Sequence, residues 1–317
     1  MTITQTTTIT AAQYNEVRER LKDMRRKETS AHYMIPDYLT PEWQARLMEE
    51  AAKGSTIDLP NPNVGPNPNV GMSQLNLWRE KICEWCYQVV DHFDYNREVV
   101  NIAMSYLDRY IAKRTVNRRI FQLAAMTALY LASKLFEPGK LQISSLVGIS
   151  RGYFLAEHIV TMEHSMLQAL SWHVYPPIPS AFCSDLTKFI SADVTPRLRH
   201  DLGELAKFLT EISVCDYHFV TRKPSSIAIA AILNAIELMG PKKIEPKHKI
   251  DFLHVIVSIG LDIADDDEII ECYERLREMY ILGGYTTMSE DEDDVPPGTT
   301  ANTKKRKRDG SDTIRST

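Results

Sequence analysis

The chain has 317 residues, of which 44% are hydrophobic and 25% charged, and its net charge is −5. This composition is that of a globular protein with enough residues for two cores, and the acidic balance argues against a surface built to bind nucleic acid. The first residues lack the basic start and apolar core of a signal peptide, and no apolar run reaches the roughly 18 residues of a membrane span. We therefore expect neither nucleic acid nor a membrane among the partners.

The N-terminal region, residues 1–72, contains two predicted helices and a loop. The charged run Ala11–Glu28 keeps its few apolar residues on one face, which predicts an amphipathic helix. Thr40 before Pro41 is typical of an N-cap followed by a first-turn proline, so a second helix is expected to begin there. The repeat of Asn, Pro and Gly over Leu59–Gly71 predicts an exposed loop.

From there to Leu282 the apolar residues recur with a helical period, and no strand alternation is evident. In a first bundle, residues 73–176, the expected helices are Ser73–Asp91, Arg97–Ala112, Arg118–Phe136, Ile143–Val147 and Arg151–Leu170. After the breaker HVYPPIPS, in a second bundle at residues 177–282, they are Ala181–Ile190, Pro196–Val214, Ser225–Met239, Pro246–Ser258 and Asp265–Tyr280. The predicted fold class is all-α, with two tandem five-helix bundles after an N-terminal helix.

The two bundles also share sequence features. LDRY at Leu107–Tyr110 parallels CDYH at Cys215–His218, and the Ala-rich segment Leu123–Ala132 parallels Ile227–Ile236. Small residues on a helix that is apolar nearly all round allow neighbouring helices to approach closely. Each Ala-rich segment is therefore expected to be the central helix of its bundle.

The C-terminal segment, residues 283–317, is polar and charged, and we expect a disordered tail because it has too little apolar surface to fold. Its basic cluster predicts a nuclear import signal, and with it a nuclear protein that has a cytoplasmic pool. The alternative is simple solvated charge. The cluster consists of Lys304, Lys305, Arg306, Lys307 and Arg308.

The five cysteines are an odd number spread through apolar helical sequence, which predicts reduced thiols rather than a disulfide framework. Cys83 and Cys86 form a C-x-x-C, but no second ligand pair lies nearby, and a structural zinc site usually needs four ligands. No metal and no cofactor is expected.

Two charged residues stand out in the apolar helical stretch from Met104 to Trp172. Lys134 closes the Ala-rich helix in LASKLF, where the free carbonyls of a last turn favour a cation. Glu163 lies on the next long helix, in VTMEHSML. A charge on packed helices needs a polar partner, because an isolated buried charge is unstable. On spacing alone, an ordinary surface lysine and glutamate or a structural ion pair explains them.

This stretch, with YLDRY, LASK and MEH in order, resembles the cyclin box, and the resemblance extends over roughly Ser73 to Tyr280. It implies tandem cyclin folds in a regulatory subunit that binds and activates a cyclin-dependent Ser/Thr protein kinase, controls the cell cycle and performs no chemistry itself. In the family, residues at the positions of Lys134 and Glu163 reach the kinase backbone near its mobile regulatory helix. Binding then selects the active kinase conformation. YLDRY is somewhat similar to the D-type group, whose Leu-x-Cys-x-Glu motif is absent.

The resemblance implies roles for two further sets of residues. Arg79 and Asp108 are expected to form an internal salt bridge between the first two helices of the first bundle. Many members of the family have an apolar docking patch on the first helix of this bundle. Lys81 departs from that pattern, because the family has an aliphatic residue at this position. That patch, for kinase substrates or inhibitors, is expected at Trp78, Ile82, Trp85 and Gln122.

A tandem-cyclin-fold transcription factor, or a scaffold without a kinase partner, is the alternative function. Such factors need a basic bundle surface and usually a zinc ribbon, and neither the net charge nor the cysteines suit them. An enzyme is not expected, because His158 and His164 do not share a helix face and no nucleophile or phosphate-loop motif occurs. The sequence does not identify the kinase, the cell-cycle phase or the route of degradation.

Overall fold

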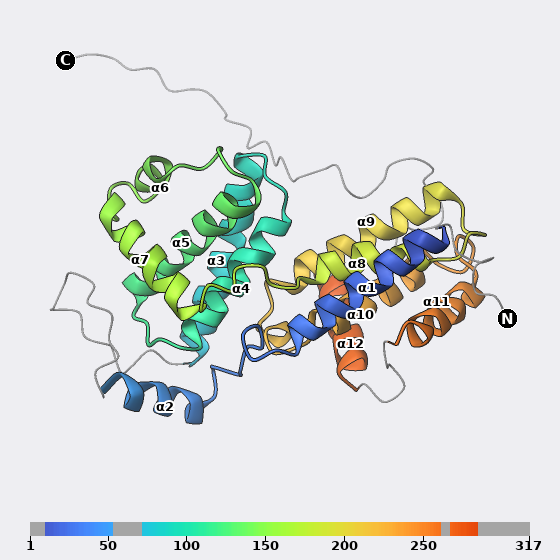
Figure 1. Ribbon diagram of the computed structural model, residues 1–317, viewed down its shortest axis with the longest axis horizontal. Helices are drawn as coiled ribbons and strands as arrows, with labels where there is room; N and C mark the ends of the chain where they lie inside the picture. Colours follow the sequence, from blue (N-terminus) through green and yellow to red (C-terminus); the bar gives the residue numbers. More distant parts are fainter. Residues whose placement is uncertain (1–9, 53–71, 261–266, 285–317) are drawn as a thin grey trace, which may run out of the picture. The chain divides into compact units, whose positions relative to one another are not determined.

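The computed structural model describes residues 10–52, 72–260 and 267–284, and within these ranges the regular structure is helical, without a strand (Figure 1). Two helices precede the bundles, α1 (Ala11–Glu28) and α2 (Pro41–Ala52). The first bundle contains α3 (Met72–His92), α4 (Glu98–Ile111), α5 (Arg118–Phe136), α6 (Ile143–Ile149) and α7 (Ala156–Ala169). The second contains α8 (Pro179–Leu186), α9 (Pro196–Ser213), α10 (Pro224–Leu238), α11 (Pro246–Ser258) and α12 (Asp267–Leu282), with short 3-10 turns η2 (Thr187–Phe189) and η3 (Tyr217–Phe219). The prediction of an all-α protein with two tandem five-helix bundles is confirmed.

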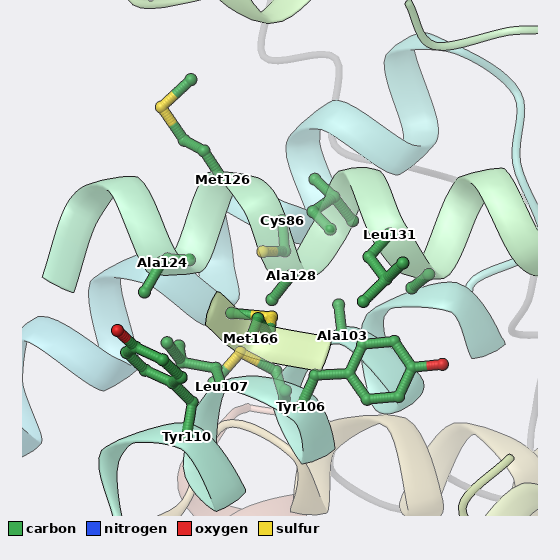
Figure 2. Close-up of a cluster of buried hydrophobic side chains, with 14 of the residues drawn as sticks. Cys86, Ala103, Tyr106, Leu107, Tyr110, Ala124, Met126, Ala128, Leu131 and Met166 are labelled. Atoms are coloured by element: carbon green, nitrogen blue, oxygen red, sulfur yellow. The ribbon is translucent and has the colours of Figure 1, made fainter. Parts of the chain in front are cut away.

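The central helix of the first bundle is α5, as its Ala-rich sequence predicts. It begins where the Asn117 side chain accepts a hydrogen bond from the Ile120 N–H, and it packs most extensively on α4 and α7. Figure 2 shows the small residues Ala124 and Ala128 on the side of α5 that faces Tyr110 and Leu107 of α4. Small residues on one helix and large ones on the next interdigitate without voids, which is the condition for a dense core.

The central helix of the second bundle is α10, in which 12 of 15 residues are buried. Pro224 at its first turn fixes a helical φ and has no N–H to leave unpaired. The helix packs mainly on α8, α9 and α12. The repeat in the sequence thus corresponds to two bundles that are each built around one apolar helix.

Helix α1 packs against the second bundle. Val17 and Leu21, on its apolar face, are buried in the core that α8, α9 and α10 form. At its end the buried Glu28 carboxylate accepts hydrogen bonds from the Ser225 N–H, at 2.9 Å, and the Ser225 hydroxyl, at 2.7 Å. The carboxylate therefore caps the N-terminus of α10, where the helix dipole favours negative charge.

Helix α2 packs instead against the first bundle. The Trp43 indole N–H donates to the Ala112 carbonyl at the end of α4, at 3.0 Å, and Leu47 is buried one turn further on. The segment between α1 and α2 thus connects two helices that contact different bundles.

Two of the predicted helices have the wrong bounds. The helix expected from Arg151 begins only at Ala156, because Arg151 and Gly152 have φ values of 53° and 75° and Leu155 is extended. A left-handed φ does not continue an α-helix. The helix expected over Ala181–Ile190 is α8, which starts at Pro179 and gives way to η2.

Other expectations fall outside the described residues. These are the Asn/Pro loop and the basic cluster Lys304–Arg308 with the rest of the tail beyond residue 284. Among the helices described, none combines the length and the apolar character needed to cross a membrane.

Candidate functional site

Lys134 and Glu163 meet at the surface of the first bundle. Lys134, in the last turn of α5, places its Nζ 2.9 Å from Oε1 of Glu163 on α7. The Lys134 side chain is 52% exposed and the Glu163 side chain 13%. The hydrogen bond to Glu163 raises the pKa of Lys134, against a smaller opposing effect of burial. The two charges are therefore paired with each other and open to solvent on the lysine side.

The apolar pattern of both helices fixes the position of this pair. On α5, Ala132 and Ser133 are buried immediately before Lys134, and on α7 Met162 is fully buried immediately before Glu163. Successive helical residues lie about 100° apart around the axis, so each charged residue lies just beyond the buried face. The pair thus lies at the rim of the core.

Exposed apolar side chains occur on α5 and α7 and in the segments that flank α7. Val160 lies one turn before Glu163 on α7 and is 50% exposed, and the exposed Phe136 ring lies two residues after Lys134, in contact with Tyr175 at 5.4 Å between centroids. Exposed apolar surface marks interaction sites where it forms a contiguous patch. The exposed large apolar side chains between residues 136 and 175 are Phe136, Ile149, Tyr153, Leu155, Val160, Trp172 and Tyr175.

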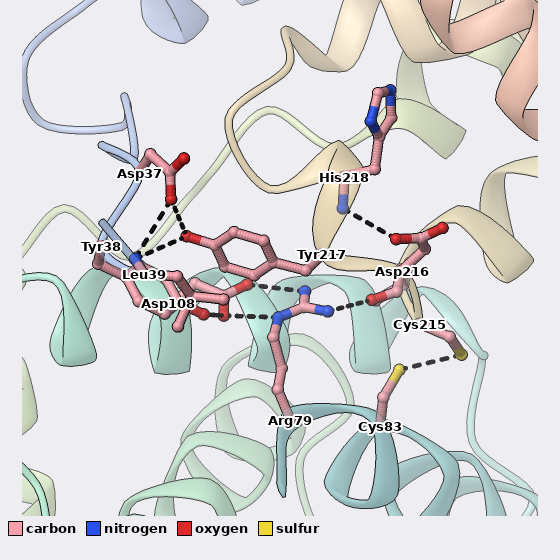
Figure 3. Close-up of polar contacts among 11 residues, drawn as sticks. Asp37, Tyr38, Leu39, Arg79, Cys83, Asp108, Cys215, Asp216, Tyr217 and His218 are labelled. Atoms are coloured by element: carbon pink, nitrogen blue, oxygen red, sulfur yellow. Dashed lines mark hydrogen bonds and ion pairs between the residues drawn. The ribbon is translucent and has the colours of Figure 1, made fainter. Parts of the chain in front are cut away.

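The structure also brings Arg79 and Asp108 together (Figure 3). Arg79 on α3 donates from Nε to Oδ1 and from Nη2 to Oδ2 of Asp108 on α4, both at 2.9 Å, and each side chain is 4% exposed. Burial works against the charge of Arg79, but the adjacent Asp108 carboxylate raises its pKa above the ordinary value. Because both charges are desolvated, each depends on the other.

This ion pair has two further partners that sequence reasoning missed. The Tyr38 hydroxyl donates to Asp108 Oδ1 at 2.8 Å, and Arg79 Nη1 donates to the Val214 carbonyl at the end of α9 at 2.9 Å. We call Tyr38, Arg79, Asp108 and Val214 the buried hub. It joins the segment between α1 and α2, both helices of the ion pair and the second bundle. The aromatic, proline-containing sequence YMIPDY was the available signal for Tyr38.

Two more cations missed at the sequence level hold the end of α7. The buried Arg109 donates to the carbonyls of Leu170, at 3.3 Å, and His173, at 2.9 Å, and Lys113 donates to the Ala169 carbonyl at 2.8 Å. Burial lowers the pKa of Arg109 to about 10. Cations at a helix C-terminus satisfy its free carbonyls and complement its dipole. The helix that carries Glu163 is thereby fixed at one end.

The expected docking patch lies on α3 and α5. Trp78, Ile82 and Trp85 have the spacing of one helix face and pack, half-buried, on the first core. Gln122 on α5, also half-buried, follows Phe121, whose ring lies 5.7 Å from that of Trp78.

The C-x-x-C cysteines do not act as a pair. Cys83 Sγ lies 3.3 Å from Sγ of Cys215, which follows α9, whereas Cys86 is buried in the first core. Within the described ranges, no group of three His, Cys, Asp or Glu side chains is placed to hold a metal ion.

Two family models match this chain. The model of the cyclin N-terminal domain matches residues 59–175, and that of the cyclin C-terminal domain matches residues 177–291. The chain belongs to the cyclin family. The two matched regions contain the two five-helix bundles of this cyclin, and Lys134 and Glu163 both lie in the first.

Curated relatives of this cyclin carry mitotic names. It is 27% identical over 222 residues to the G2/mitotic-specific cyclin S13-6 of Glycine max, covering 70% of this chain and 45% of the relative. It is 32% identical over 187 residues to the G2/mitotic-specific cyclin-B2 of Oryzias javanicus, covering 58% and 47%. The chain thus spans about half the length of the curated relatives it matches. These names lend no support to the D-type likeness of YLDRY.

Solved structures share the fold. A viral cyclin from herpesvirus saimiri superposes with a TM-score of 0.54 at 18% identity, covering 66% of this chain and 88% of the viral one. A chain of the yeast RNA Pol II CTD kinase CTDK-1 complex gives a TM-score of 0.53 at 14% identity, covering 81% and 76%. At these identities the similarity concerns the fold.

Proposed function

We propose that this cyclin is a regulatory subunit that binds and activates a cyclin-dependent Ser/Thr protein kinase and so controls progression through the cell cycle. The observation that carries the proposal is the Lys134–Glu163 pair in the matched cyclin N-terminal domain, with its lysine exposed to solvent and the exposed Val160 one turn from Glu163. Relatives named as mitotic cyclins support the cell-cycle role.

The geometry of the pair suits recognition of a kinase backbone. A lysine ammonium has three donors and a carboxylate has two acceptor oxygens, and the contact between Lys134 and Glu163 uses one of each. The remaining groups lie side by side, so that one partner segment can meet a donor and an acceptor together. Charge-assisted hydrogen bonds of this kind fix orientation, while an apolar neighbour such as Val160, one turn from Glu163, supplies buried area.

Activation follows from differential binding. A kinase is active only when a Glu on its mobile helix pairs with the catalytic Lys. If the cyclin surface fits only that arrangement, the free energy of binding shifts the kinase population towards it. We infer that the cyclin takes no chemical step and that the reacting groups belong to the kinase.

Two further parts of the proposal rest on other residues. Trp78, Ile82, Trp85 and Gln122 form a surface for kinase substrates or inhibitors, and the half-buried state of the α3 residues limits it to shallow docking. The basic cluster Lys304–Arg308 directs the complex to the nucleus.

The test is reconstitution with a mitotic cyclin-dependent kinase catalytic subunit and a histone substrate. Wild-type cyclin should co-purify with the kinase and raise phosphorylation, and Lys134→Ala with Glu163→Ala should lose both. The matched control is Lys247→Ala with Glu245→Ala, an ion pair of the same residue types and the same 2.9 Å distance on the second bundle, which should behave as wild type.

The result that overturns the proposal is folded wild-type cyclin that neither captures nor activates the kinase. In that case the transcription-scaffold alternative is tested with random duplex DNA at low salt, where a DNA-binding scaffold should shift the duplex.

A further inference from the structure

The two bundles touch at a pair of free cysteine thiols. Cys83 lies on α3, one turn after Arg79, and Cys215 lies in the turn between α9 and η3, next to Val214. Their sulfur atoms are 3.3 Å apart, although 132 positions separate them in the sequence (Figure 3). The thiol pair therefore lies beside the Arg79–Val214 hydrogen bond of the buried hub, which already links the first bundle to the second.

The two thiols have different environments. Cys83 is fully buried, whereas Cys215 is only partly buried and is the sulfur that a small oxidant reaches first. The hydrogen bond between the two thiols, together with the nearby Arg79 charge, lowers the pKa of Cys215, and the same hydrogen bond and burial raise the pKa of Cys83. The thiolate is the reactive form of cysteine, and exposure and a lowered pKa both favour its oxidation.

We propose that Cys83 and Cys215 are a peroxide-sensitive modification site, which forms a reversible disulfide between the two bundles. The Cys215 thiolate attacks one oxygen of hydrogen peroxide, becomes a sulfenic acid, and releases hydroxide that takes up a proton to give water. Cys83 loses its proton and attacks the Cys215 sulfur, so that the sulfur–sulfur bond forms and a second water leaves. The two thiols give up two electrons, and the peroxide is reduced to two waters.

The geometry allows the bond to close with little movement. A disulfide is about 2.05 Å long, so the two sulfur atoms must approach by a little over an ångström. Cys215 lies in a turn between helices and not within one, so its backbone can adjust without breaking a helix. Disulfides in reducing compartments are usually transient and redox-sensing, as a reversible bond between these two thiols would be. Closure would replace a hydrogen-bonded joint between the bundles by a covalent one.

The test uses the full chain, reduced, freed of reductant, treated with hydrogen peroxide, alkylated, and digested without reduction. We expect a cross-linked peptide that joins Cys83 to Cys215 within one chain, a loss of two alkylatable thiols, and reversal by dithiothreitol. Cys215→Ala should abolish the cross-link, whereas Cys86→Ala, which removes a buried thiol one turn away on α3, should leave it. Cys83→Ala should arrest the reaction at a Cys215 sulfenic acid that dimedone labels.

Two results overturn the proposal. One is folded wild-type protein in which peroxide oxidises Cys215 to the sulfinic acid, or links it to another chain, without joining it to Cys83. The other is a Cys215→Ala protein that loses two alkylatable thiols to a dithiothreitol-reversible disulfide as readily as wild type does, because the bond would then join other cysteines. Because the wild-type experiment needs no variant to fold, it decides the question even if a substituted protein is unstable.

Discussion

Removal of the Asp108 carboxylate tests the importance of the buried hub. Asp108→Ala leaves the Arg79 guanidinium buried with the Val214 carbonyl as its remaining hydrogen-bond acceptor in the hub, and takes the acceptor from the Tyr38 hydroxyl. Breaking one side of a buried ion pair costs about 3–5 kcal/mol, against a total stability of about 5–15 kcal/mol. We expect a loss in this range and a first bundle that unfolds at much lower urea concentration.

A second Arg–Asp pair provides a matched control. Arg97 binds Asp91 with the same two-pronged geometry, at 2.9 and 2.8 Å, but the side chains are 40% and 45% exposed. An exposed pair contributes at most about 1 kcal/mol, so Asp91→Ala should change stability little. The two variants thus differ mainly in the burial of the ion pair that is broken.

Urea unfolding followed by tryptophan fluorescence is a suitable assay. The four tryptophans lie in α2, in α3 and just after α7, so the signal reports on the first bundle and on the helix that packs against it. The double variant Arg79→Met with Asp108→Leu should regain much of the loss, because no uncompensated charge remains. Equal losses for Asp108→Ala and Asp91→Ala, or no recovery in the double variant, would refute the reasoning.

Three further predictions concern other contacts. Burial raises the pKa of Glu28 above 4.5, so the folded state binds more protons than the unfolded one, and stability falls as the pH rises from 4.5 through the raised pKa. The wild-type free energy of unfolding should therefore decline relative to that of Glu28→Gln across this window, in urea titrations at several pH values. Trp43→Phe should cost about 1 kcal/mol through the lost hydrogen bond to Ala112, measured by the same fluorescence assay. Arg109→Met should free carbonyls at the end of α7 and speed amide exchange there, measured by mass spectrometry, while α9 keeps its protection.

Local signals in the sequence predicted most helices well. The helices α1, α5 and α11 have the predicted bounds, because charge patterning, apolar periodicity and the prolines that open helices are all local. The early start predicted for α7 is wrong because Arg151 adopts a left-handed φ. An arginine side chain gives no indication of that backbone conformation in the sequence.

The contacts between segments that are distant in the sequence were harder to predict. The resemblance to cyclins led us to expect Arg79 beside Asp108, but not the Tyr38 hydroxyl or the Val214 carbonyl, which lie 70 and 135 positions from their partners. Every residue has a backbone carbonyl, so no sequence motif marks the one that accepts the hydrogen bond from Arg79. The contact between Cys83 and Cys215 was missed for a similar reason. The C-x-x-C spacing suggests Cys86 as the partner of Cys83, whereas in the folded chain the neighbouring thiol is that of Cys215.

The affinity of the purified cyclin for a mitotic cyclin-dependent kinase tests the central claim most directly. Calorimetric titration should give a dissociation constant for Lys134→Ala with Glu163→Ala that is at least about 100-fold weaker than wild type, as expected for two lost charge-assisted hydrogen bonds. The Lys247→Ala and Glu245→Ala control should match wild type, and circular dichroism should show that all three proteins are folded. A folded double variant that binds the kinase as tightly as wild type would contradict the account.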